Sequence, residues 1–149
     1  MSSNKLEITR VMHASPEKVF LAWKNPNLLR QWFAPGALQV PDVEIDFRIG
    51  GSFSVAMEGE VRGQQTSGKM TGTYKEIVAN KRLVFVCTGT WRGSAPETTV
   101  TVTFQEIPSG TEVRLVQEGF IDEKDRQGHE HGWGSSLDKL QDALQRGAK

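Results

Sequence analysis

Apolar and polar residues alternate through the middle of the chain, from Leu38 to Gln117. A period of two places the apolar side chains of a strand on one face of a sheet. The stretches with this period are Val43–Phe47, Phe53–Met57, Met70–Val78, Leu83–Cys87, Val100–Phe104 and Val113–Gln117. Turn sequences such as RIGG, ANKR and PSG separate them, and we expect the polar stretch from 59 to 68 to be a loop. Consecutive strands joined by turns predict an antiparallel sheet.

Helical signals come before this sheet. A first strand is predicted at Leu6–His13, and Ser15 and Asn25 follow as candidate N-caps. Each cap precedes a proline, the residue that suits the first position of a helix. We therefore expect two short helices in tandem, the second extending through Trp32 and ending at Pro35.

A longer amphipathic helix is predicted near the end of the chain. Its apolar residues are spaced by four, three and four positions: Trp133, Leu137, Leu140 and Leu144. This spacing describes one face of a helix of about twenty residues that begins near Asp122. The predicted fold is α+β, a curved antiparallel sheet of about six to seven strands with two short helices after the first strand and a long C-terminal helix. The 149 residues fit one domain, and we expect its core to span about 6–144.

Composition narrows the classes of function. The 18 basic and 18 acidic residues give a formal net charge of zero, which argues against nucleic acid as a partner. Cys87 is the single cysteine, so an intrachain disulfide cannot form. The polar residues 1–5 lack the apolar segment of a signal peptide, and no apolar run is long enough for membrane insertion. We therefore expect a soluble cytoplasmic protein.

Several stretches resemble a known family, namely ASPEKVFLAWKNPNLLRQWF, VEIDFRIGGSFSVAM, GTYKEIVANKRLVF, TVTVTFQEIPSGTEVRL and GHEHGWGSSLDKL. In order and spacing they are similar to the START-like (helix-grip) superfamily, and within it to small bacterial proteins related to the C-terminal domain of the heat-shock-protein-90 ATPase activator. The resemblance implies a cavity between the sheet and the long helix, often suited to an apolar ligand. It implies less about activity, because this fold serves ligand carriers, cyclases, hydratases and co-chaperones. The eukaryotic activator makes much of its chaperone contact through a separate N-terminal domain, which we expect 149 residues to be too few to hold.

The candidate cavity residues are large side chains predicted to face inward. They are Phe53, Val55, Met57, Met70, Phe85, Trp91, Phe120, Leu137 and Trp32. One helix covers a wide curved sheet poorly, and methionine adapts to ligands of varied shape, so these residues are predicted to line a cavity. The alternative is that they fill the core completely. Trp32 and Phe33, from the short helices, are expected to close one end of the cavity, and the alternative for them is ordinary packing on the sheet edge. Gln117 shares the register of Leu115 and is predicted to present its amide inward.

The sequence HEHGWG suggests metal or acid–base chemistry, because His129 and His131 flank a carboxylate. A helical zinc pair needs histidines four residues apart, whereas residues two apart point to nearly opposite sides of a helix. We therefore expect no metal site, with His129 facing inward beside Trp133 and His131 facing solvent. His129 is a candidate acid–base or ligand-orienting group, and the alternative is a packing or capping histidine. The glycines on either side of Trp133 indicate either a close approach of the helix to the sheet or room for a ligand beside the indole.

Three hypotheses for the function follow. The first is a protein that binds a small apolar or amphipathic ligand between the sheet and the C-terminal helix, oriented by His129 and Trp133. The second is a cyclase- or hydratase-type enzyme with His129 as its acid–base group; no other catalytic residue and no cofactor is indicated. The third is an interaction module that contacts a chaperone or forms a homodimer. We favour ligand binding over catalysis.

Overall fold

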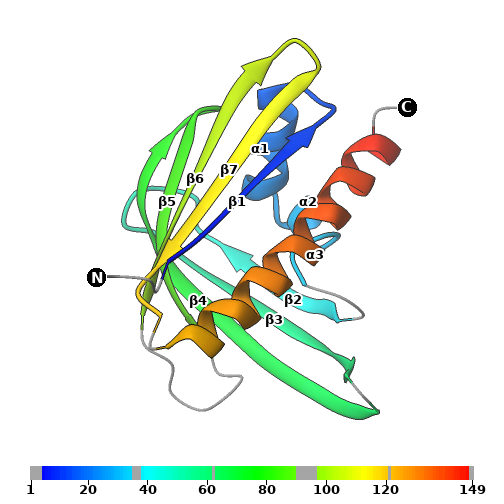
Figure 1. Ribbon diagram of the computed structural model, residues 1–149, viewed down its shortest axis with the longest axis vertical. Helices are drawn as coiled ribbons and strands as arrows, with labels where there is room; N and C mark the ends of the chain where they lie inside the picture. The colour runs from blue at the N-terminus through cyan, green and yellow to red at the C-terminus, as the bar shows by residue number, and fades with distance from the viewer. Residues whose placement is uncertain (1–4, 35–37, 62, 90–96, 121, 148–149) are drawn as a thin grey trace.

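The computed structural model describes residues 5–34, 38–61, 63–89, 97–120 and 122–147. Seven strands form one antiparallel sheet in the order β1-β7-β6-β5-β4-β3-β2 (Figure 1). The elements are β1 (Lys5–Met12), α1 (Pro16–Lys24), α2 (Pro26–Leu29), β2 (Gln39–Ile45), β3 (Ser52–Val61), β4 (Gln64–Val78), β5 (Arg82–Gly89), β6 (Thr98–Ile107), β7 (Gly110–Glu118) and α3 (Glu123–Gly147). The predicted helix-grip fold is confirmed.

The helices pack against one face of the sheet, with α3 running beside β1 and α1 lying on β6 and β7 (Figure 1). The first two strands of the chain, β1 and β2, lie at opposite edges of the sheet, and α1 and α2 connect them. From β2 to β7, each strand pairs with the next one in the chain. The buried apolar residues of the strands and of the helices form a core between these layers. An internal site must therefore lie between the inner face of the sheet and the helices.

The second short helix ends earlier than predicted. Asn25 caps it as expected, its side-chain oxygen accepting the amide N–H of Leu28 at 3.2 Å. However, α2 spans only Pro26–Leu29, so the prediction that it extends through Trp32 was wrong. Beyond the helix the chain turns tightly, and the amide of Trp32 donates to the carbonyl of Leu29 at 3.2 Å. This turn buries the side chains of Trp32 and Phe33.

The stretch from 59 to 68 is a hairpin, and the prediction of a loop there was wrong. β3 and β4 stay paired to their ends, where Val61 lies opposite Gln64. Only residues 62 and 63 separate the two strands, and Gly63 has a φ of +79°. A two-residue hairpin turn needs positive φ, which glycine adopts without steric cost. Its polar flanking residues concealed the strands, because they lack an apolar face.

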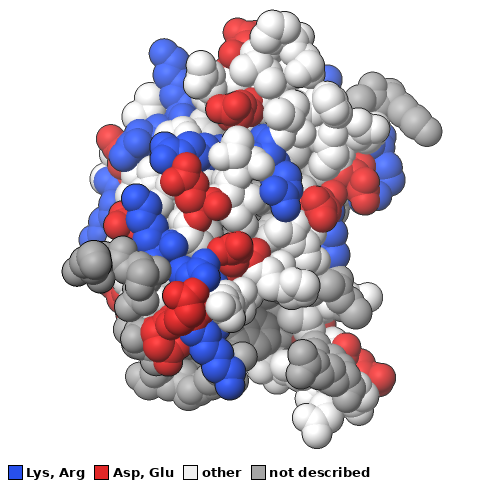
Figure 2. All heavy atoms as spheres, in the orientation of Figure 1, with Lys and Arg blue, Asp and Glu red and all other residues white. Residues whose placement is uncertain are grey.

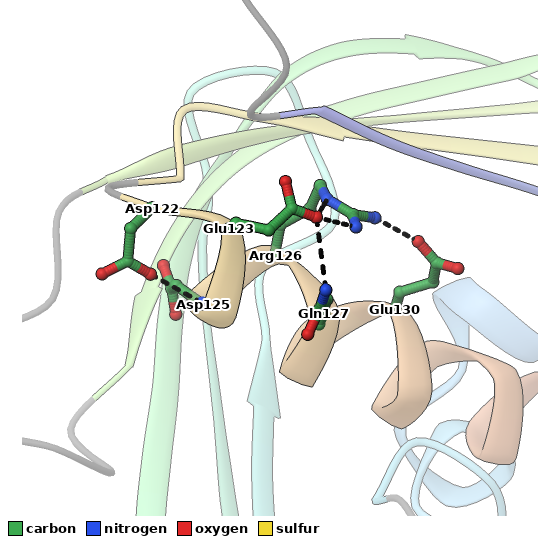
Figure 3. A network of polar contacts seen from close by, with 6 residues as sticks. All are labelled: Asp122, Glu123, Asp125, Arg126, Gln127 and Glu130. Atoms are coloured by element: carbon green, nitrogen blue, oxygen red, sulfur yellow. Dashed lines mark hydrogen bonds and ion pairs between the residues drawn. The ribbon is translucent and has the colours of Figure 1, made fainter.

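The long helix begins near the predicted residue. Asp122 accepts the amide N–H of Asp125 through its side chain at 2.8 Å, which satisfies one of the unpaired amides of the first turn. Arg126 bonds both Glu123 and Glu130 along one side of the helix (Figure 3). Its guanidinium lowers the pKa of the Glu123 carboxyl. Both carboxylates are about half exposed, so these pairs contribute little to the stability of the fold.

The surface mixes charges of both signs. Lys and Arg side chains alternate with Asp and Glu over the face that contains α3 and β1 (Figure 2). One such pair crosses from β1 to β7, where Arg114 donates to Glu7 at 2.6 Å. Among the described residues, no helix is both long and apolar enough to cross a membrane.

Candidate functional site

A small apolar cavity lies between the inner face of β2–β5 and the helical segment that runs from Trp23 to Phe33. Its volume is about 10 Å³, roughly the space that one buried water needs. The residues that line it are Trp23, Leu29, Phe33, Ile45, Phe53, Val55, Tyr74, Leu83 and Phe85. Only Trp23 and Tyr74 among them carry a polar side-chain atom. The cavity is therefore suited to an apolar occupant with few polar groups.

Three of the predicted cavity residues line this space, namely Phe53, Val55 and Phe85. The others lie elsewhere: Met57, Phe120, Leu137, Trp32, Gln117 and Trp133 are buried in other parts of the core, and Met70 and His129 are half-buried. Trp91 lies outside the described residues. Phe33, which was expected to close one end of the cavity, also lines it. Sequence reasoning left Trp23, Leu29, Ile45, Tyr74 and Leu83 out of the site. The inward register of Ile45 and Leu83 could have suggested them, whereas nothing in the sequence placed Trp23 opposite them.

Gly72 sets the position of one cavity wall. It lies opposite Phe53 in the β3–β4 pairing. A Cβ atom added to Gly72 would come within 2.4 Å of the Phe53 ring and 2.3 Å of the carbonyl oxygen of Val86. Glycine therefore lets Phe53 lie flat over the strand, where its ring also contacts Tyr74 and Phe85, with centroids 5.2 Å away in each case.

Three buried tryptophans gather where α1, the turn after α2, and α3 meet. The rings of Trp23 and Trp32 are 4.6 Å apart, and those of Trp23 and Trp133 are stacked at 6.1 Å. The indole N–H of Trp32 donates to the carbonyl of Ala22 at 3.1 Å. In a continuous helix that carbonyl would accept the amide of residue 26, but Pro26 has no N–H. Trp32 thus supplies the donor that the proline removes.

Trp133 faces the sheet as predicted, and its indole N–H donates to the side-chain oxygen of Gln117 at 2.7 Å. The amide nitrogen of Gln117 in turn donates to the hydroxyl of Thr98 at 2.8 Å. That hydroxyl is 3.4 Å from the carbonyl oxygen of Cys87. The chain of buried polar groups joins α3 to β7, β6 and β5. Gln117 presents its amide inward as predicted, and its partners are residues of the protein.

Gly134, one of the two glycines beside Trp133, does not require a close approach of the helix to the sheet. A Cβ atom at Gly134 would lie 3.5 Å from a guanidinium nitrogen of Arg10, which is an ordinary contact. Trp133 does not line the described cavity. The structure therefore gives neither of the two expected reasons for Gly134.

Two side chains of α3 hold the segment that follows α2. The hydroxyl of Ser136 donates to the carbonyl of Phe33 at 2.8 Å. The ammonium of Lys139 donates to the carbonyls of Ala34 at 2.6 Å and Leu38 at 3.5 Å. Partial burial lowers the pKa of Lys139. Together with the edge contact between the rings of Phe33 and Trp133, these bonds fix the Phe33 wall of the cavity.

His129 is engaged with its own helix. Its Nδ1 atom lies 2.9 Å from the carbonyl oxygen of Asp125 and 3.4 Å from a carboxylate oxygen of the same residue. Its ring packs on Phe120 with centroids 4.9 Å apart. His129 does not line the described cavity, and His131 is exposed. Within the described part of the chain, no three His, Cys, Asp or Glu side chains are grouped as metal ligands.

Burial favours the neutral forms of Tyr74 and Cys87, two titratable side chains of the core. Desolvation, followed by the negative charge of Asp46, raises the pKa of the Tyr74 phenol. Desolvation likewise raises the pKa of the Cys87 thiol, despite its hydrogen bond with Thr98. A thiol that stays protonated is a poor nucleophile. The chemistry at the cavity is therefore that of uncharged groups.

Comparison with known proteins places the chain in a family. The sequence pattern of the family described as Activator of Hsp90 ATPase homolog 1-like protein matches residues 13–145. The chain belongs to this family. Its membership confirms the START-like superfamily that the sequence resembles. No curated protein matches the sequence.

Solved structures of bacterial proteins share the fold over nearly the whole chain. An uncharacterised protein of Rhizobium leguminosarum is 28% identical with a TM-score of 0.81, covering 95% of this chain and 94% of that one. A protein of Chromobacterium violaceum is 26% identical with a TM-score of 0.79, covering 93% and 95%. The AHSA1 protein of Silicibacter pomeroyi is 25% identical with a TM-score of 0.79, covering 94% and 96%.

Proposed function

We propose that the protein binds one small, largely apolar molecule in the cavity between the sheet and the side chains of Trp23 and Phe33. The observation that carries this proposal is the lining itself. Five aromatic rings from different elements, those of Trp23, Phe33, Phe53, Tyr74 and Phe85, surround a space that they do not fill. Apolar walls with very few polar groups are typical of ligand sites. The resemblance to the START-like superfamily implied a cavity between the sheet and the long helix, whereas no residue of α3 lines this one. The family therefore supports a cavity inside the fold and not its position beside Trp23 and Phe33.

The cavity must enlarge to admit an organic molecule. Its volume of about 10 Å³ compares with the roughly 150 Å³ of a cavity that binds benzene. The strands that carry the other aromatic rings are paired on both sides in the sheet, whereas Phe33 follows a helix of four residues, and the hydrogen bond from Ser136 holds its backbone carbonyl and not its ring. We therefore expect Phe33 to move aside when the ligand binds. The work of displacing it lowers the affinity for any ligand.

Ethylbenzene is a suitable first probe, because it has an aromatic ring and no polar atom. Protein labelled at its methyl groups is titrated with it, and intermolecular NOEs are measured by NMR. We expect NOEs to the methyls of Ile45, Val55 and Leu83, which line the cavity. Leu140 is as deeply buried as Val55 and Leu83 and does not line the cavity, so its methyls are the internal control and should show none.

A variant removes the free-energy cost of displacing Phe33 from the test. Phe33→Ala removes the wall that we expect to move, and should bind ethylbenzene more tightly than the wild type. Phe104→Ala is the matched control, since Phe104 is exposed to the same 5% and does not line the cavity. It should not strengthen the NOEs to Val55 and Leu83. Absence of binding by both the wild type and Phe33→Ala would refute the proposed function.

A further inference from the structure

The indole N–H of Trp23 has no hydrogen-bond partner. Trp23 is only 2% exposed, and its Nε1 atom is the buried side-chain nitrogen or oxygen without a partner in the described part of the chain. The two other tryptophans of this cluster are satisfied, Trp32 by Ala22 at 3.1 Å and Trp133 by Gln117 at 2.7 Å. Buried donors in native proteins are nearly always paired. The unpaired indole of Trp23 therefore calls for a cause.

The unpaired donor belongs to a residue that lines the apolar cavity. An occupant with an acceptor atom would give the indole the partner that the protein does not. A buried polar group that gains its partner only from the ligand makes a strong discriminator between ligands with and without the matching atom.

We infer that the Trp23 indole N–H is the polar recognition group of the cavity, and that the ligand is an apolar molecule carrying one uncharged hydrogen-bond acceptor such as a carbonyl oxygen. This inference rests on the proposed function. The indole can donate and cannot accept, so the complementary ligand atom is an acceptor. The lining residues include no Lys, Arg or His, so a buried carboxylate or phosphate would lack a counter-charge. An anionic headgroup is thereby disfavoured.

Acetophenone and ethylbenzene form a matched pair of probes, because they differ in a carbonyl oxygen and have similar shapes. Their dissociation constants are measured for the wild type and for Trp23→Phe, which keeps an aromatic ring and removes the N–H. For each protein we take the ratio of the two dissociation constants. The free probes are hydrated to the same extent in both experiments, so a difference between the two ratios reports only on contacts within the site. We expect this preference for acetophenone to fall by about tenfold in Trp23→Phe, the usual consequence of losing one buried hydrogen bond. In Trp32→Phe, whose indole is already paired, the ratio should stay unchanged.

The wild-type protein gives a second readout that needs no variant. The indole N–H resonances of ¹⁵N-labelled protein are followed by NMR during both titrations. Acetophenone should move the Trp23 resonance downfield, as hydrogen bonding does, while ethylbenzene should not. The Trp133 resonance, whose N–H is bonded to Gln117, should respond to neither probe in this way.

The outcomes separate this inference from the proposed function. If both probes bind among the cavity residues with the same ratio in the wild type and in Trp23→Phe, the inference is overturned and the proposed function stands. A Trp23 N–H that is bonded to a buried water and keeps that water when acetophenone binds also overturns it. If neither probe binds to the wild type or to Phe33→Ala, the proposed function fails and the inference fails with it.

Discussion

Replacing Gln117 by methionine should destabilise the protein through the loss of two buried hydrogen bonds. Gln117 is fully buried, and it joins the indole of Trp133 to the hydroxyl of Thr98. Methionine has a similar length and fills the same space, but its sulfur is a weak acceptor. The substitution therefore tests the polar connection between α3 and the sheet with little change in packing.

The magnitude follows from the two bonds that are lost. The Trp133 N–H would be left buried without an acceptor, which costs about 1–3 kcal/mol. Thr98 keeps the carbonyl of Cys87 as a second partner at 3.4 Å, so losing the Gln117 amide costs it only about 0.5–1.5 kcal/mol. Burial of the thioether offsets part of this sum. We expect the free energy of unfolding to fall by about 2–3 kcal/mol.

Urea unfolding followed by circular dichroism measures this change in the free energy of unfolding. A double-mutant cycle then shows how much of it comes from the hydrogen bond between Gln117 and Trp133. Trp133→Phe removes the donor, so Gln117→Met should cost about 1–2 kcal/mol less in that background than in the wild type. Leu115→Met is the matched control, because it places methionine at another fully buried position of β7 and should cost less than about 1.5 kcal/mol. Additive effects of the two substitutions would show that the buried bond does not stabilise the fold.

Further predictions concern single residues of the core and of α3. Tyr74 is the only tyrosine, and burial raises its pKa, so the folded protein should show no tyrosinate absorbance at pH about 10, where the unfolded chain titrates. Its contribution to stability is complete below that pH and is lost as the pH rises through the folded pKa; tyrosinate absorbance near pH 10 in folded protein would contradict this. Gly128→Ala should raise the free energy of unfolding by about 0.5–1 kcal/mol, because an added Cβ meets open space in a helix. Gly72→Ala should lower it, because an added Cβ would clash with the Phe53 ring and the Val86 carbonyl; in urea unfolding, a fall for the first or a rise for the second would refute the corresponding argument. Cys87 is the only cysteine and is 3% exposed, so it should react with iodoacetamide only at the rate of unfolding, and fast labelling of native protein would show that it is accessible.

The sequence predicted the features that depend on periodicity. Alternation located the strands around Phe53, Leu83 and Val102, because a half-buried strand must place its apolar residues two apart. The spacing from Trp133 to Leu140 likewise gave the buried face of α3. The hairpin from 59 to 68 escaped prediction, because both of its faces are polar and period two then leaves no signal.

The site could not be located in the same way. Periodicity tells which side of an element faces the core, but it does not tell which inward side chains leave a gap between them. The cavity depends on where Trp23 and Phe33 lie against the strands, and the early end of α2 decides this. These are consequences of tertiary packing.

A crystal structure of the wild-type protein in complex with acetophenone tests the proposed site most directly. We expect the aromatic ring between Phe33, Phe53 and Phe85, with Phe33 displaced from its present position and the carbonyl oxygen within hydrogen-bond distance of Trp23 Nε1. The contrary result is a cavity that stays closed at about 10 Å³, with Phe33 unmoved and the probe absent or bound elsewhere on the protein.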